Sequence, residues 1–123
     1  PKAIVMENVP TILGKRGARH VGIVETMFAG AGYRVRKCVL DAASYGVPQF
    51  RRRAVIVAVR SDFDSGFTFP LPSHGPNHFR TVREAIGDLP PPPHDGSEHP
   101  DYPNHRLVLV SPVNLERLSH VPE

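Results

Sequence analysis

The stretch VPQFRRRAVIVAVR, residues 47–60, joins three consecutive arginines to an almost uninterrupted run of Val, Ile and Ala. An unpaired buried arginine is costly, whereas a run this apolar is typical of a strand that is covered on both faces. The sequence therefore predicts a central strand over residues 54–59. It also raises the question of what Arg51, Arg52 and Arg53 contact where that strand begins.

Patterns upstream of this strand complete an α/β unit. Residues 2–9 are a short apolar run closed by Pro10, which indicates a buried strand. Residues 19–31 repeat apolar side chains at three- and four-residue spacings, which predicts an amphipathic helix that Gly32 can end. In residues 33–40 the side chains alternate in polarity, which predicts a strand with one face more exposed to solvent. We therefore predict the order strand, helix, strand, strand.

The rest of the chain is rich in proline and predicts only short helices. Thr81 followed three residues later by Glu84 is a capping box, which predicts a short helix. Ser111 followed by Pro112 indicates the N-cap and the first position of another helix.

Charge divides the chain at the end of the apolar strand. Residues 1–60 carry eleven Lys and Arg against three acidic residues, a balance of +8, whereas residues 61–123 carry four basic and nine acidic residues, a balance of −5. The basic half predicts a polyanionic partner, with ordinary solvated charge as the alternative interpretation. A single cysteine, with no leader or long apolar run, favours a reducing, cytoplasmic setting and no membrane.

Polar side chains lie at the ends of two predicted strands. Glu7 and Asn8 close the first strand, at the carboxyl edge where open α/β sheets bind their ligands. Gln49, Arg51 and Arg53 enter the apolar strand at every second position, so an extended chain would present them on one face. These five residues are the candidate site.

Two motifs in this order resemble those of the DNA cytosine-5 methyltransferases. MENV, residues 6–9, contains that family's Glu-Asn-Val motif, and YGVPQFRRRAVIVAVR, residues 45–60, contains its Gln-x-Arg-x-Arg motif preceded by Tyr-Gly-Val-Pro. The sequences FTFPLPSH, TVREAIGDLP and NHRLVLVSPVNLERLSHVPE are similar to the stretch that leads to the family's target recognition region. The resemblance thus covers nearly the whole chain.

The resemblance implies a fold and a domain organisation. We expect part of a Rossmann-like class I methyltransferase sheet of three strands in the order first, third, second, with the third strand antiparallel to its neighbours. Residues 1–60 would be the C-terminal part of the catalytic α/β domain. Residues 61–123 would be a Pro-rich extension with short helices that leads to the target recognition region.

The resemblance also implies a role for each candidate residue. The family transfers a methyl group from S-adenosylmethionine to carbon 5 of a cytosine flipped out of DNA. A cysteine adds to carbon 6, and Glu7 matches the acid that meets the negative charge pushed toward ring nitrogen N3. Arg53 would donate to the cytosine carbonyl and brace Glu7, while Arg51 would hold a backbone phosphate. Gln49 and Asn8 complete the DNA-binding set, more by ordering loops than by touching the base.

Two family motifs do not occur in these residues. The nucleophile sits in a Pro-Cys motif and the cofactor pocket begins with a Phe-x-Gly-x-Gly loop, and in the family both precede Glu-Asn-Val. Cys38 follows Lys37 within a predicted strand, so we interpret it as a core thiol. The glycines of AGAG, residues 29–32, end a helix rather than follow a strand. We therefore expect an internal segment of a methyltransferase, of the bacterial restriction-modification type, that is inactive alone.

Two other functions stay open at this point. One is a relative that methylates transfer RNA, and the other is a catalytically dead module that only binds nucleic acid. A metal site is not predicted, because Gly75 and Pro76 separate His74 from His78 and the later histidines lie in a Pro-rich loop.

The implied sheet also predicts partners. DNA is the first, and it would associate the protein with the nucleoid. In the family the first strand here has another neighbour upstream, so in this chain residues 3–8 would form an open sheet edge. Such an edge is a template for association. We expect self-association through it, or a Pro-rich arm folded over it.

Overall fold

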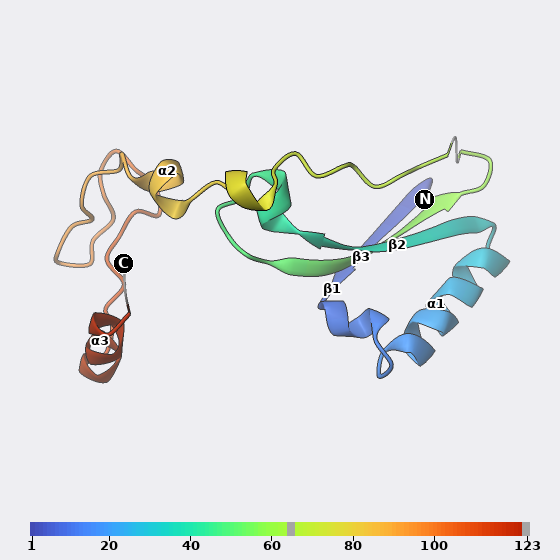
Figure 1. Ribbon diagram of the computed structural model, residues 1–123, viewed down its shortest axis with the longest axis horizontal. Helices are drawn as coiled ribbons and strands as arrows, with labels where there is room; N and C mark the ends of the chain where they lie inside the picture. The colour runs from blue at the N-terminus through green and yellow to red at the C-terminus, as the bar shows by residue number, and fades with distance from the viewer. Residues whose placement is uncertain (64–65, 122–123) are drawn as a thin grey trace. The chain divides into compact units, whose positions relative to one another are not determined.

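The computed structural model describes residues 1–63 and 66–121 (Figure 1). The chain divides into two compact units, Pro1–Gly87 and Asp88–Glu123. The elements of the first unit are β1 (Ala3–Asn8), η1 (Pro10–Leu13), α1 (Ala18–Gly30), β2 (Tyr33–Asp41), η2 (Ala42–Tyr45), β3 (Arg52–Arg60), η3 (Pro76–His78) and α2 (Val82–Ile86), and the second unit contains α3 (Pro112–Ser119).

Strand β3 is the centre of a three-stranded sheet. The order is β1-β3-β2, and β3 is antiparallel to both neighbours. Ala54 and Ala58 are fully buried and Ile56 is 4% exposed, so the apolar run is the core of the sheet. The predicted α/β class, strand order and central strand are confirmed. The strand begins at Arg52, two residues earlier than the apolar run alone indicated.

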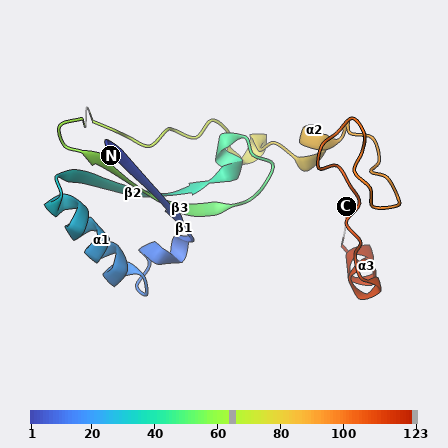
Figure 2. The ribbon, with the colours of Figure 1, turned by 180° about the vertical axis from the view of Figure 1, so that it is seen from behind.

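Helix α1 covers one face of this sheet (Figures 1 and 2). Residues opposite each other in the register share a face, and Met6, Ile56 and Lys37 are in such a row. Lys37 forms an ion pair with Glu25 of α1, with 2.6 Å between Nζ and Oε1, so this row faces the helix. The neighbouring row, which includes Glu7, therefore lies on the opposite face.

Two glycines determine where α1 begins and ends. Gly32 has a φ of +82°, a conformation that favours glycine, and it follows the last turn of the helix as predicted. Gly17 precedes the first turn, and a Cβ there would lie 2.0 Å from the carbonyl oxygen of Ile12. Only glycine allows η1 and α1 to approach this closely.

Strand β1 lies at the edge of the sheet and is open to solvent. Val5 is 67% exposed and Met6 is 37% exposed. The Pro-rich segment that follows β3 is held at η2 instead, since Tyr45 donates a hydrogen bond to the Pro70 carbonyl at 2.9 Å. The described residues of this segment in the first unit therefore leave β1 uncovered.

The two predicted helix starts are confirmed. Thr81 Oγ1 accepts from the Glu84 N–H, and Glu84 Oε2 accepts from the Thr81 N–H, which completes the capping box of α2. Ser111 caps α3, with Pro112 in its first turn. Among the described residues, no helix has both the length and the apolar character needed to cross a membrane.

Candidate functional site

Glu7 and Arg53 meet at one end of the sheet. Because β1 and β3 are antiparallel, the end of β1 lies beside the beginning of β3, with Glu7 opposite Val55. Arg53 Nε lies 2.6 Å from Glu7 Oε1. The predicted contact between these two side chains, which are far apart in sequence, is confirmed, and it gives the last of the three consecutive arginines its partner.

Within this ion pair, the Arg53 guanidinium is fixed by a second hydrogen bond, and the Glu7 carboxylate is exposed to solvent. Arg53 Nη1 donates to the Arg52 carbonyl at 2.9 Å, which fixes the guanidinium along its own strand. The side chain of Arg53 is 27% exposed, and that of Glu7 is 55% exposed. A guanidinium has five N–H donors, so these two contacts leave donors for a ligand oxygen. The Glu7 carboxylate is accessible to a ligand.

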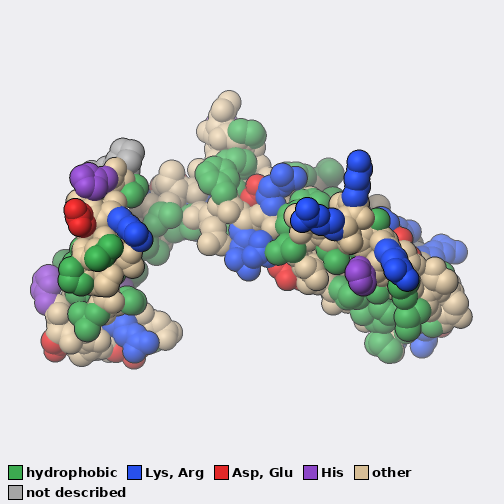
Figure 3. Space-filling view, turned by 90° about the horizontal axis from the view of Figure 1, so that it is seen from below, with side chains coloured by type: hydrophobic (Ala, Val, Ile, Leu, Met, Phe, Trp, Pro, Cys, Tyr) green, Lys and Arg blue, Asp and Glu red, His purple; other side chains and the backbone are tan. Residues whose placement is uncertain are grey.

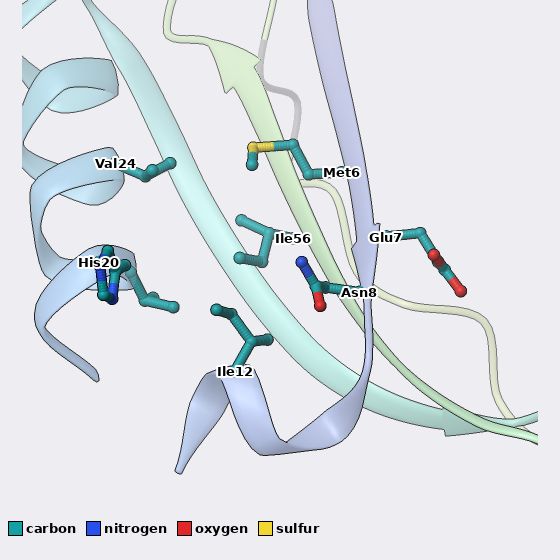
Figure 4. A pocket seen from close by; sticks show the side chains of 8 residues that line it. Met6, Glu7, Asn8, Ile12, His20, Val24 and Ile56 are labelled. Carbon is teal, nitrogen blue, oxygen red and sulfur yellow. The ribbon is translucent and has the colours of Figure 1, made fainter. Parts of the chain in front are cut away.

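Asn8 points to the other face of the sheet from Glu7. Figure 4 shows Asn8 directed with Met6 and Ile56 toward α1, whereas Glu7 extends away from them. These three side chains line a hollow of about 140 Å³. The Asn8 Oδ1 accepts from the Val9 N–H at 2.8 Å, so the side chain orders the chain after β1. The structure thus does not bring Asn8 together with Glu7, as the two-residue period of a strand already implied.

The Gln49–Arg51 segment is not extended in the predicted way. The chain bends at Pro48 and Gln49, and the Gln49 N–H donates to the Val47 carbonyl at 2.7 Å. The strand begins only at Arg52. The prediction that Gln49, Arg51 and Arg53 share one face of a continuous strand is therefore wrong at Gln49, because the turn that delivers the chain to β3 extends through that residue.

Asp41 organises this bend, and sequence reasoning overlooked it. Its Oδ1 accepts from the Ala43 N–H at 3.2 Å and from the Arg51 N–H at 3.3 Å. The Asp41 side chain thus caps η2 and anchors the backbone that carries Arg51. The signal was present, because an aspartate that follows an apolar strand is a favoured N-cap residue.

The far end of β3 carries charges that pair with each other. Arg60 Nε lies 2.7 Å from Asp62 Oδ1, and this hydrogen bond lowers the pKa of the Asp62 carboxyl. Lys2 and Arg60 also stack over the Phe63 ring, at 4.6 and 4.7 Å from its centroid. Figure 3 shows Lys and Arg side chains spread over the unit that contains the sheet.

The described residues contain no group of three His, Cys, Asp or Glu side chains arranged to hold a metal ion. Gly30 and Gly32 lie at the C-terminal end of α1, as expected, and not in a loop that follows a strand. The observed site is therefore an ion pair at the end of a sheet, with exposed arginines beside it.

The fold of this sheet matches part of a solved methyltransferase structure. A prophage-encoded Escherichia coli protein described as a DNA modification methyltransferase matches it with a TM-score of 0.62 at 22% identity, over 73% of this chain and 26% of that one. The chain belongs to the C-5 cytosine-specific DNA methylase family, whose family model matches residues 1–107.

The chain is also similar in sequence to several type II methyltransferases. The chain is 39% identical over 93 residues to the type II methyltransferase M.BsuRI of Bacillus subtilis, a match that covers 72% of the chain and 21% of the relative. It is 38% identical over 114 residues to M.MthTI of Methanothermobacter thermautotrophicus, covering 88% and 34%. M1.HphI of Haemophilus parahaemolyticus is 36% identical over 122 residues, covering 98% and 31%. The chain thus spans between a fifth and about a third of the length of these relatives.

Proposed function

We propose that these residues belong to a DNA cytosine C5-methyltransferase of the restriction-modification type and form the part of its active site that protonates and holds the target base. The observation that carries the proposal is the 2.6 Å contact between Arg53 and Glu7 at the end of the sheet, in a chain of this family. Because its relatives include type II methyltransferases, we take DNA rather than transfer RNA as the substrate.

Glu7 is the acid that we assign to the cytosine ring. Addition of a thiolate to carbon 6 pushes electrons toward N3, and a carboxylic acid at hydrogen-bond distance can supply the proton that N3 then takes up. Oε1 of Glu7 is held by Arg53. We therefore assign the proton transfer to the second oxygen, Oε2, which is open to solvent and would take up a proton from water before giving it to N3.

Arg53 has two assigned tasks. Its Nε orients the Glu7 carboxylate, and its remaining N–H donors suit the carbonyl oxygen of the same base. Arg51 is exposed at the bend and is assigned to a backbone phosphate, where a fixed cation positions the strand without reading sequence. Gln49 and Asn8 are assigned to shaping the loops beside the DNA.

S-adenosylmethionine would supply the methyl group in the whole protein, and no residue of this chain is assigned to it. The glycines that could have formed a nucleotide loop lie at the end of α1, so they do not fit that role. The proposal therefore includes the expectation that residues 1–123 alone do not methylate DNA.

The experiment uses the full-length protein that contains these residues. Glu7→Gln keeps the shape of the side chain but cannot deliver the proton. We expect turnover on a DNA substrate to fall about 10²- to 10⁴-fold while DNA affinity changes little. Methyl transfer is measured with labelled cofactor, and affinity with a fluorescent duplex.

Glu25→Gln is the matched control. It removes another 2.6 Å carboxylate ion pair, on the opposite face of the sheet. We expect it to leave turnover unchanged. A Glu7→Gln enzyme that keeps more than about a tenth of the parent rate contradicts the assigned role. Methylation of transfer RNA in place of DNA would support the RNA alternative, and binding without methylation by the parent protein would support the dead module.

A further inference from the structure

A second exposed feature lies in the segment that leads into β3, three residues before Arg53. Phe50 is 80% exposed, although a Phe side chain usually contributes to the core. Its ring contacts Phe79 edge-to-face, with centroids 5.6 Å apart and an interplanar angle of 77°. Phe79 thus supports the Phe50 ring, while most of the surface of that ring stays open to solvent.

Both phenylalanines are followed in sequence by arginines. Arg51 and Arg52 follow Phe50, Arg80 follows Phe79, and all three arginines are exposed. Phe50, Phe79 and Arg80 are among the residues that line a hollow of about 260 Å³.

The nearby acids already have backbone partners. Asp41 accepts from the Arg51 N–H and Glu84 accepts from the Thr81 N–H. The surface therefore combines open π faces with positive charge, which is the combination that binds exposed nucleobases joined by phosphates.

Phe63 shows that exposure of a Phe beside basic residues is not enough by itself. It is 45% exposed at the other end of β3, but Lys2 and Arg60 cover its ring at 4.6 and 4.7 Å. No comparable cation lies over Phe50 among the described contacts. The two phenylalanines therefore differ in whether a ring face is available for stacking.

We propose that Phe50, supported by Phe79 and flanked by Arg51 and Arg80, stacks on an unpaired nucleobase of the DNA strand that carries the target. Phe50 lies three residues before Arg53, so the two Cα atoms are at most about 10 Å apart. The ring is therefore close enough to contact the DNA strand beside the target nucleotide, from the face of the sheet opposite the one that carries Glu7. This inference rests on the proposed function, because it takes DNA as the ligand.

The test measures binding of the 123-residue chain to fluorescent single-stranded DNA by anisotropy at low salt. Phe50→Ala and Phe50→Leu both remove the ring, and Leu keeps an apolar side chain of similar size. We expect either change to weaken binding about 5- to 150-fold, the range for loss of one stacked base. Phe63→Leu is the control and should bind like the parent chain.

A second oligonucleotide has the same length but consists of abasic nucleotides. Comparing its binding with that of the first shows whether Phe50 contacts a base or the sugar–phosphate backbone. The parent chain should prefer the strand with bases, and Phe50→Ala should lose that preference. If Phe50→Ala binds both strands as the parent chain does, the inference is overturned while the proposed function stands. If the parent chain binds no DNA at low salt, the inference is overturned, while the proposed function is decided separately by the turnover of the full-length Glu7→Gln enzyme.

Discussion

The ion pair between Glu7 and Arg53 can be tested by a double-mutant cycle in the isolated chain. The variants are Glu7→Gln, Arg53→Met and the two together. Gln keeps the size of the carboxylate, and Met keeps the aliphatic part of the arginine. The cycle isolates the pairwise term, so the loss of the hydrogen bond from Arg53 to the Arg52 carbonyl cancels.

The expected coupling free energy follows from the exposure of the two side chains. Fully exposed pairs contribute about 0.2–1 kcal/mol, whereas a hydrogen bond to a charged group contributes about 1.5–3 kcal/mol. Arg53 is 27% exposed and Glu7 is 55% exposed, so the pair lies between these cases. We expect about 1 kcal/mol, which is roughly a fivefold change in the folding equilibrium.

Urea unfolding followed by circular dichroism gives the four free energies of unfolding. Because more than half of the Glu7 side chain is in solvent, the coupling should fall in about 1 M salt, where the Debye length is about 3 Å. A coupling below about 0.2 kcal/mol would show that the contact is not maintained in solution. A coupling above about 3 kcal/mol would indicate a buried pair, which is incompatible with a carboxylate open to a base.

Three further predictions concern the fold. Gly17→Ala should destabilise the first unit by about 1–3 kcal/mol, because a Cβ at this position would clash with the backbone of Ile12. Gly22→Ala should stabilise it by about 0.5–1 kcal/mol, because a Cβ there meets nothing within 4 Å. Equal effects of the two changes in thermal unfolding would contradict the close approach of η1 and α1. Hydrogen bonds from the Thr81 backbone N–H and side chain hold the pKa of Glu84 below its ordinary value of 4.5, so the capping box should stabilise α2 above that pH and weaken as pH falls through the lowered value. Thr81→Ala keeps the backbone donor and should only reduce this pH dependence of the unfolding midpoint, whereas Glu84→Gln should abolish it. The open β1 edge should drive self-association, which sedimentation would detect and Val5→Lys should reduce; a parent chain that sediments as a monomer at every concentration contradicts this.

Elements that depend on neighbours in sequence were predictable. The apolar run in β3, the helical spacing in α1 and the stop at Gly32 each rest on a few consecutive residues, and so does the capping box of Thr81 and Glu84. Their physics is local, because a period, a cap or a left-handed glycine is set within one or two turns of chain. The strand order came from the family resemblance rather than from these patterns.

The sequence by itself determined the elements, the family motifs and the residue types at the candidate site. The contact between Arg53 and Glu7 was expected from the family resemblance, and the tertiary structure decided its geometry. Only the tertiary structure decided that the Asp41 side chain accepts from the Arg51 N–H before β3. The same holds for Phe79, which supports an exposed Phe50. Each of these contacts joins segments that are distant in sequence. The contacts of Glu7 and Asp41 form only when the register of β3 against β1 and β2 brings those segments to one end of the sheet, and no local pattern specifies that register. The contact of Phe79 depends instead on where the segment after β3 returns to the sheet.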